Sequence, residues 1–284
     1  MSSSDDYLMR KLRELLEDFD VIFTGAHMAL IESSEYLQDF KQNITAAAIA
    51  SSLRISSIDY TKKNYLPDLR ESDRDLSSAY IEAYKELKEY VISSVERLDS
   101  EDKRLPSPGV FAASIVLERL ISSFFSAHLL YRLGNTYEGH AVSRLLLEQM
   151  AWAYAVHKLP DLKKIKATSP SKSISSLKAF VPKAGKLYGF LSKKTHLDYE
   201  SHPEFLRVKD GKNFIIHSHI KFEEYASVLL NLADIFVLVW ESTQFEYIDE
   251  TISVEKKNDQ ILPLEKRIFL NVIERCLNEI KSLT

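Results

Sequence analysis

The stretch that decides the fold runs from Val110 to Leu159 and reads VFAASIVLERLISSFFSAHLLYRLGNTYEGHAVSRLLLEQMAWAYAVHKL. Apolar side chains recur through most of it at the three- and four-residue spacing of a helix. Residues 134–135, Gly-Asn, interrupt the pattern, and Thr136 follows as a residue able to cap a new helix. Because the connection is short, we expect an antiparallel helical hairpin. Its first helix, which ends at Leu133, is apolar nearly all round and is predicted to be buried.

Glycine is scarce in this chain, with 7 in 284 residues, where an ordinary composition holds about 7%. Few glycines means few tight turns with positive φ, which disfavours β-sandwiches and glycine-looped nucleotide folds. Hydrophobic residues still make up 45% of the chain, which is enough to bury a core. The sequence therefore predicts an all-α protein built as a multi-helix bundle.

Helical spacing extends over most of the remaining chain. The helices it predicts span residues 5–40, 44–60, 73–98, 171–196, 221–240 and 263–282, with an interruption at Pro182. The segment 205–216 differs, because Asp210 and Gly211 separate two short apolar runs. This is the pattern of a β-hairpin, and we expect it to be the only sheet in the molecule.

Two prolines, Pro106 and Pro108, mark the strongest linker in the chain, between Asp99 and Gly109. A domain boundary at this linker is the natural expectation. It gives an N-terminal helical region, residues 1–105, and a C-terminal helical bundle, residues 106–284.

Three features bear on where the protein works. The single cysteine, Cys276, cannot form an internal disulfide, which fits a reducing compartment. The first seven residues lack the basic flank and apolar run of a signal peptide. The longest apolar run, Val228 to Trp240, is too short to span a bilayer. A soluble cytoplasmic protein without a membrane partner is predicted.

A polar stripe follows the helix predicted from Tyr137 to Leu159. At 100° per residue, Tyr137, His140, Arg144 and Glu148 fall on one side, while most of the remaining circumference is apolar. The stripe either meets solvent or lines an internal polar cleft. An exposed Arg144–Glu148 ion pair would add only a few tenths of a kcal/mol, and its Arg-before-Glu order is the less favourable one.

A second polar group lies at residues 192–196, Ser-Lys-Lys-Thr-His. The four-residue spacing puts Ser192 and His196 on one helix face, with Tyr188 a turn earlier. A hydroxyl near an imidazole can form a nucleophile–base pair or handle protons in phosphodiester chemistry. The alternative is a surface serine beside a packing histidine.

Two further groups are interpreted as structural. Asp234 lies within an apolar helix and needs a cationic partner, for which Arg144 is the first candidate. His217 and His219 flank a serine, but a lone His-x-His is weak as a metal signature, so no metal site is predicted.

Positive charge is concentrated between Lys158 and Lys194. This segment holds ten lysines and one acid, Asp161, for a local charge of +9, although the whole chain carries −4. Such a segment can follow a phosphate backbone, or it can be a solvated lysine-rich face. The lysines predicted to bind nucleic acid are Lys163, Lys164, Lys166, Lys193 and Lys194.

The motifs Arg144-x-x-x-Glu148 and Tyr188-x-x-x-Ser192-x-x-x-His196 together resemble those of an uncharacterised type of bacterial all-helical protein. Proteins of that type look distantly related to the HEPN superfamily of defence and toxin–antitoxin proteins. The resemblance covers about residues 110–240.

HEPN ribonucleases generally carry an arginine a few residues before a histidine on one helix and usually complete the active site across a dimer. This sequence departs from that spacing. Arg132 lies eight positions before His140, across a predicted turn, and no arginine stands at the family's distance before His196.

The resemblance implies a protein of a bacterial defence or stress system that binds or cleaves RNA without a metal or other cofactor. It places the catalytic residues at Arg144, Glu148, Ser192 and His196. His196 would handle the proton of a ribose 2′-hydroxyl, Arg144 would neutralise the phosphate, and Glu148 would orient one of them. A homodimer or another protein partner is also implied.

Two other functions remain open on the sequence alone. One is a non-catalytic helical scaffold or sensor whose polar stripe is structural. The other is a small-ligand binder with its pocket between helices. Whether the protein is an enzyme is therefore not decided by the residues.

Overall fold

The computed structural model describes residues 19–24, 27–32, 38–66, 71–98, 105–196, 199–209, 211–215 and 220–284. It divides the chain into two compact units, Met1–Asp75 and Leu76–Thr284. This division falls inside helix α4 (Glu71–Val95), earlier than the boundary predicted near residue 105. Part of that predicted linker, 99–104, lies outside the described residues.

The first unit contains a β-hairpin where the sequence predicted a helix. β1 (Phe19–Thr24) pairs antiparallel with β2 (His27–Glu32), with Phe19 opposite Glu32. The helix predicted over 5–40 is therefore wrong across these strands, and its first part, 5–18, lies outside the described residues. Val-Ile-Phe-Thr at 21–24 is β-branched and aromatic, so it fits a pleated strand better than a helix.

The described part of this unit also holds α2 (Gln38–Leu53), α3 (Ile58–Tyr65) and the first residues of α4. α2 packs against α3 and against the hairpin. α3 begins after Ser57, whose side chain accepts a hydrogen bond from the Tyr60 backbone N–H. This is the N-cap contact expected at a helix start.

The second unit is a helical bundle, which confirms the all-α prediction. Its α-helices, with the second part of α4, are α5 (Pro108–Arg132), α6 (Thr136–Val156), α7 (Leu162–Ala167), α8 (Pro170–Phe180), α9 (Pro182–Thr195), α10 (Phe222–Thr243) and α11 (Ile268–Ser282). Short 3₁₀ helices span η2 (Tyr199–Phe205) and η3 (Phe245–Tyr247). The break between α8 and α9 falls at Pro182, as predicted.

Two more hairpins lie in this unit. β3 (Leu206–Lys209) pairs with β4 (Lys212–Ile215), which confirms the hairpin predicted near 205–216. β5 (Val254–Lys257) pairs with β6 (Gln260–Pro263). With β1–β2, the described residues hold three two-stranded sheets, so the expectation of a single sheet is wrong.

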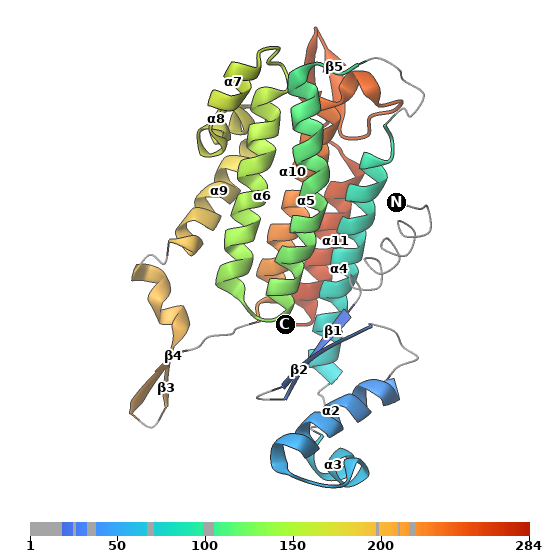
Figure 1. Ribbon diagram of the computed structural model, residues 1–284, viewed down its shortest axis with the longest axis vertical. Coiled ribbons are helices and arrows are strands. Elements are labelled where there is room, and N and C mark those ends of the chain that lie inside the picture. The colour runs from blue at the N-terminus through green and yellow to red at the C-terminus, as the bar shows by residue number, and fades with distance from the viewer. Residues whose placement is uncertain are drawn as a thin grey trace. The chain divides into compact units, whose positions relative to one another are not determined.

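The predicted helical hairpin is formed by α5 and α6, which lie antiparallel (Figure 1). Gly134 adopts a φ of 74° in the turn, a conformation that glycine takes without strain. At the other end Gly109 sits against the end of α6. A Cβ on Gly109 would lie 2.3 Å from the Val156 carbonyl oxygen, so no side chain fits there.

α5 is less buried than its composition predicts. By length and composition it could cross a membrane, yet only 28% of its most apolar 18-residue window is buried. Phe111 and Ile115 are more than half exposed. The prediction of a helix buried all round is therefore wrong for α5.

The helix that is buried nearly all round is α10. α10 packs against α5, α6 and α11. From Val228 to Thr243 all of its side chains are buried except Asn231. Burial of a Leu, Val or Phe side chain contributes about 1.5–3 kcal/mol each, so α10 forms the centre of the core.

A histidine in this core makes stability depend on pH. His128 on α5 is stacked on the Tyr84 ring at 3.6 Å, and its Nδ1 lies 3.2 Å from the Tyr80 hydroxyl. Burial, with the nearby Arg132 charge, lowers the pKa of His128 well below 6.5. As the pH falls below about 6.5, His128 therefore binds a proton in the unfolded chain but not in the folded chain.

We expect this histidine to make the protein less stable in mild acid. The free energy of unfolding should fall by up to about 1.4 kcal/mol per pH unit between pH 6.5 and pH 5. His128→Phe keeps a ring against Tyr84 and removes the titrating group. Urea unfolding at several pH values should give a flatter profile for this variant, and an equal slope in both proteins would contradict the assignment.

Candidate functional site

The structure brings together residues from α6 and α9, which pack side by side. Arg144 and Glu148 project from consecutive turns of α6. Tyr188 and Thr195 come from α9, and His196 is the residue that ends it. α9 begins at Pro182, whose fixed φ suits the first turn of a helix.

The Arg144 guanidinium is held in a closed arrangement with two partners. Its Nε donates to Glu148 Oε1 at 3.0 Å, and its Nη2 donates to the Tyr188 hydroxyl oxygen at 3.2 Å. The Tyr188 hydroxyl in turn donates to Glu148 Oε1 at 3.2 Å. The guanidinium carbon also lies 5.3 Å from the centre of the Tyr188 ring. These contacts fix the plane of the guanidinium.

The remaining contacts of Arg144 reach the end of α9. Nη1 lies 3.3 Å from Thr195 Oγ1 and 2.9 Å from His196 Nε2. Because an arginine cannot accept a hydrogen bond, His196 must accept this one through an unprotonated Nε2. The geometry therefore requires a neutral His196 with its proton on Nδ1.

The group is half-buried, with one open side. Side-chain exposure is 23% for Arg144 and 19% for Glu148, while His196 is exposed. Burial alone would lower the pKa of Arg144, but the hydrogen bond with Tyr188 and the Glu148 charge raise it. Arg144 therefore stays charged at the surface end of the group.

Three of the four predicted catalytic residues thus lie together: Arg144, Glu148 and His196. Ser192 does not join them, because its Oγ is buried and has no hydrogen-bond partner among the described residues. Sequence reasoning did not assign Tyr188 and Thr195 to the site. The seven-residue interval between them places both on the α9 face that meets α6, which is the signal that could have found them.

Two other stripe residues serve packing. The Tyr137 hydroxyl donates to the Thr195 carbonyl oxygen and ties α6 to the end of α9. His140 is fully buried, with Nδ1 3.1 Å from the Tyr131 hydroxyl and Nε2 3.1 Å from Glu224 Oε1. His140 therefore faces α10 and not the Arg144 group.

The partner predicted for Asp234 is wrong. This fully buried carboxylate receives Arg267 in a two-pronged contact, Nε to Oδ1 at 2.9 Å and Nη2 to Oδ2 at 2.8 Å. Lys183 Nζ also donates to Oδ2. Arg144 is bound to α9 instead, so Asp234 is a structural anchor joining α9, α10 and the start of α11.

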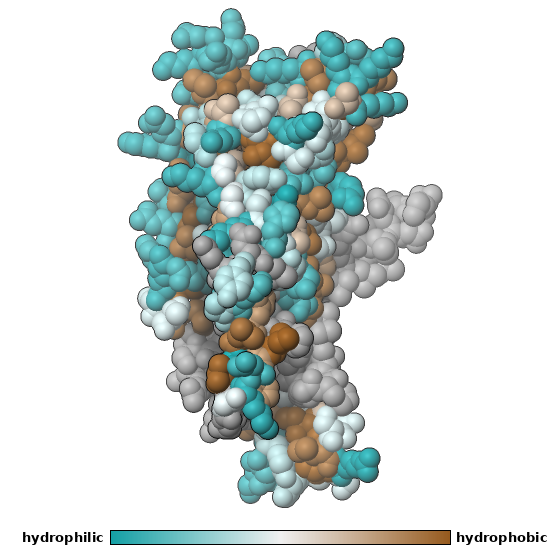
Figure 2. Space-filling view, turned by 90° about the vertical axis from the view of Figure 1, so that its left-hand side faces the viewer, coloured by the Kyte–Doolittle hydropathy of each residue, from teal (hydrophilic) through white to brown (hydrophobic). Residues whose placement is uncertain are grey.

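The predicted nucleic-acid-binding lysines differ in their surroundings. Lys163, Lys164 and Lys166 are exposed on α7, and Lys193 is exposed near the end of α9. Figure 2 shows that hydrophilic residues prevail on the face that carries α7 to α9.

Lys194 is the exception among these lysines. Its Nζ lies 2.6 Å from Glu204 Oε1, and Lys221 lies 2.6 Å from Oε2 of the same carboxylate. Burial alone would raise the pKa of Glu204, but hydrogen bonds from the two lysines lower it to about 2. The charge of Lys194 is therefore largely compensated within the protein.

Within the described ranges, no three His, Cys, Asp or Glu side chains are placed to hold a metal ion. His217 and His219 lie outside those ranges. Comparison of the chain with protein-family models, curated proteins and solved structures finds no match.

Proposed function

We propose that this protein binds RNA at the Arg144–His196 group and cleaves its phosphodiester backbone without a metal ion. The observation that carries the proposal is the contact between Arg144 Nη1 and His196 Nε2. It joins a permanent positive charge to a neutral imidazole on an exposed side of the bundle. Phosphate anchoring and proton abstraction need these two groups side by side.

In the proposed reaction a backbone phosphate takes the place of His196 as the partner of Arg144 Nη1. The freed Nε2 lone pair accepts the proton of the adjacent ribose 2′-hydroxyl. The 2′-oxygen attacks phosphorus, the bond to the 5′-oxygen breaks, and that oxygen leaves with a proton from solvent. The products are a 2′,3′-cyclic phosphate and a 5′-hydroxyl.

The surrounding residues support the proposed roles of Arg144 and His196. Glu148 and Tyr188 hold the guanidinium from the protein side, so it does not have to be ordered when a phosphate arrives. The exposed lysines of α7 and Lys193 supply long-range attraction for the backbone. Attachment to a defence or stress system, a distant HEPN relationship, cytoplasmic location and a homodimer remain parts of this proposal.

The test uses purified protein and mixed cellular RNA in the presence of a metal chelator. We expect wild type to give fragments ending in cyclic phosphate, and His196→Ala to lose about a hundredfold or more of the rate. His202→Ala, at an exposed histidine on η2, is the matched control and should cleave like wild type. Equal RNA cleavage, or equal lack of it, by wild type and His196→Ala overturns the catalytic proposal.

One observation favours a second function, a non-catalytic helical scaffold. Arg144 already donates to Glu148, Thr195, His196 and Tyr188, which leaves little of its hydrogen-bonding capacity for a ligand. In that case Arg144→Ala costs about 1–3 kcal/mol of stability and changes no RNA-directed activity. Urea unfolding measured beside the RNA assay separates the two functions.

A further inference from the structure

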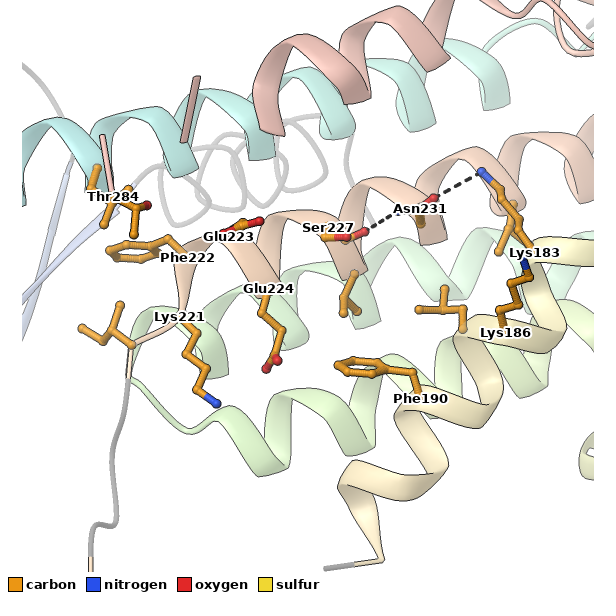
Figure 3. Close-up of a pocket in the computed structure, with 15 residues that line it drawn as sticks. Lys183, Lys186, Phe190, Lys221, Phe222, Glu223, Glu224, Ser227, Asn231 and Thr284 are labelled. Carbon is orange, nitrogen blue, oxygen red and sulfur yellow. Dashed lines mark hydrogen bonds between the residues drawn. The ribbon is translucent and has the colours of Figure 1, made fainter. Parts of the chain in front are cut away.

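A cavity of about 790 Å³ lies between α9 and α10 (Figure 3), and neither Arg144 nor His196 lines it. Both helices pack on α6. The cavity uses a different face of α9, with Lys183, Lys186, Leu187 and Phe190 at helical spacing. Its volume lies within the range of about 300–1,000 Å³ that is typical of small-molecule sites.

The middle of the cavity is apolar. Leu187 and Phe190 contribute from α9, and Val228 contributes from α10. Figure 3 shows Phe190 projecting between the two charged ends. Such a surface favours a ligand with a hydrocarbon body.

One end of the cavity carries excess positive charge. Lys183 and Lys186 lie there together with Asn231 (Figure 3). The nearest carboxylate, Asp234, is already matched by the two-pronged contact of Arg267 and is shared with Lys183. Lys186 has no acidic partner among the described residues. Asp234 is thus occupied by Arg267 and Lys183, and a ligand anion would give Lys186 a partner.

The opposite end is balanced. Lys221 pairs with Glu204, Glu223 lies 3.5 Å from Lys281, and Glu224 contacts His140. The carboxylates at this end each lie within 4 Å of a basic side chain, although Glu224 Oε1 makes no hydrogen bond of good geometry among the described residues. The cavity is thus polarised, because the positive charge without an acidic partner among the described residues, Lys186, lies at one end.

We propose that this cavity binds an amphipathic carboxylate, a hydrocarbon chain whose carboxylate pairs with Lys186 and lies beside Lys183. The chain fills the apolar middle between α9 and α10. This site is independent of the RNA proposal, because it uses neither Arg144 nor His196. If the protein does not cleave RNA, the proposal of a carboxylate site is not affected.

The test is calorimetric titration of the whole protein with decanoate, decanol and decyltrimethylammonium. We expect decanoate to bind about tenfold more tightly than decanol, since one ion pair distinguishes them. Decyltrimethylammonium should be weaker still. Shortening decanoate by one methylene should weaken binding by up to about fourfold.

Two substitutions locate the site. Lys186→Gln should bring decanoate down to the affinity of decanol, whereas Lys178→Gln on α8, exposed and outside the cavity, should bind like wild type. Ser227→Phe projects a ring into the cavity and should abolish binding of both ligands. Thermal unfolding checks that each variant is folded.

Absence of decanoate binding in wild type overturns the proposal. So does a Lys186→Gln variant that binds decanoate as tightly as wild type, because the anion would then lie elsewhere. Equal affinity for decanoate and decanol would likewise contradict the proposed ion pair between the ligand carboxylate and Lys186.

Discussion

Asp234→Asn should destabilise the protein by about 3–5 kcal/mol, the cost of leaving buried cations without their counter-charge. The substitution preserves size and leaves Arg267, whose side chain is only 9% exposed, and Lys183 around a neutral amide. Urea unfolding measures the loss. A loss of this size would remove a large part of the stability that an ordinary domain has.

The pH dependence of this loss identifies its cause. Burial lowers the pKa of Lys183 and the Asp234 charge opposes that shift. Without the carboxylate, the pKa of Lys183 in the folded variant is lower still, whereas Lys183 in the unfolded chain keeps its ordinary pKa. The difference in stability from wild type should therefore shrink as the pH rises toward 10.

Asp259→Asn is the matched control. Its side chain is 98% exposed, and its backbone φ of 60° is one that asparagine tolerates. This variant should unfold within about 0.5 kcal/mol of wild type. A small effect at Asp234, comparable with that of the control, would mean that the buried ion cluster does not hold α10 to α11.

Glu241→Gln is expected to produce the second large effect, about 2–4 kcal/mol. This fully buried carboxylate accepts Arg97 Nη2 at 2.7 Å and the backbone N–H groups of Ile252, Ser253 and Val254. The shortest backbone contact, from Ser253, is 2.7 Å. An amide would turn one acceptor into a donor facing other donors.

Hydrogen exchange distinguishes this mechanism from a general loss of stability. The backbone N–H groups of Ser253 and Val254 should exchange faster in Glu241→Gln, relative to amides in α10, because they lose their acceptor. Glu255→Gln, at an exposed position on β5, is the control and should leave both measurements unchanged. Unchanged protection at residues 253–254 would contradict the assigned role of Glu241.

The helices were predictable where the sequence repeats at helical spacing, and the strands were predictable only where the turn is distinctive. Asp210-Gly211 identified β3–β4. β1–β2 was missed because its apolar residues also fit a helical period. β5–β6 turns on Asn258 and Asp259, with φ of 50° and 60°, a conformation these residues adopt more readily than most. That pair was the overlooked signal.

The candidate site was predictable within each helix and not between helices. Four-residue spacing placed Arg144 with Glu148, and the same spacing placed Ser192 with His196. Contact between the two helices depends on how α9 rotates about its axis against α6. That rotation brings Tyr188 and Thr195 to Arg144 and leaves Ser192 Oγ without a partner among the described residues. Asp234 illustrates the same limit, because Arg267 lies 33 positions away.

The close packing of Gly109 on α5 against the end of α6 limits which substitutions evolution can accept at this position. The atoms nearest to an added Cβ are the backbone carbonyl oxygens of Val156, His157 and Leu159, at 2.3 to 2.7 Å, and backbone cannot rotate aside as a side chain can. Neighbouring substitutions therefore have little means of compensating for a larger residue at position 109. Position 109 therefore accepts one amino acid, because every other residue carries the Cβ that the backbone of α6 excludes.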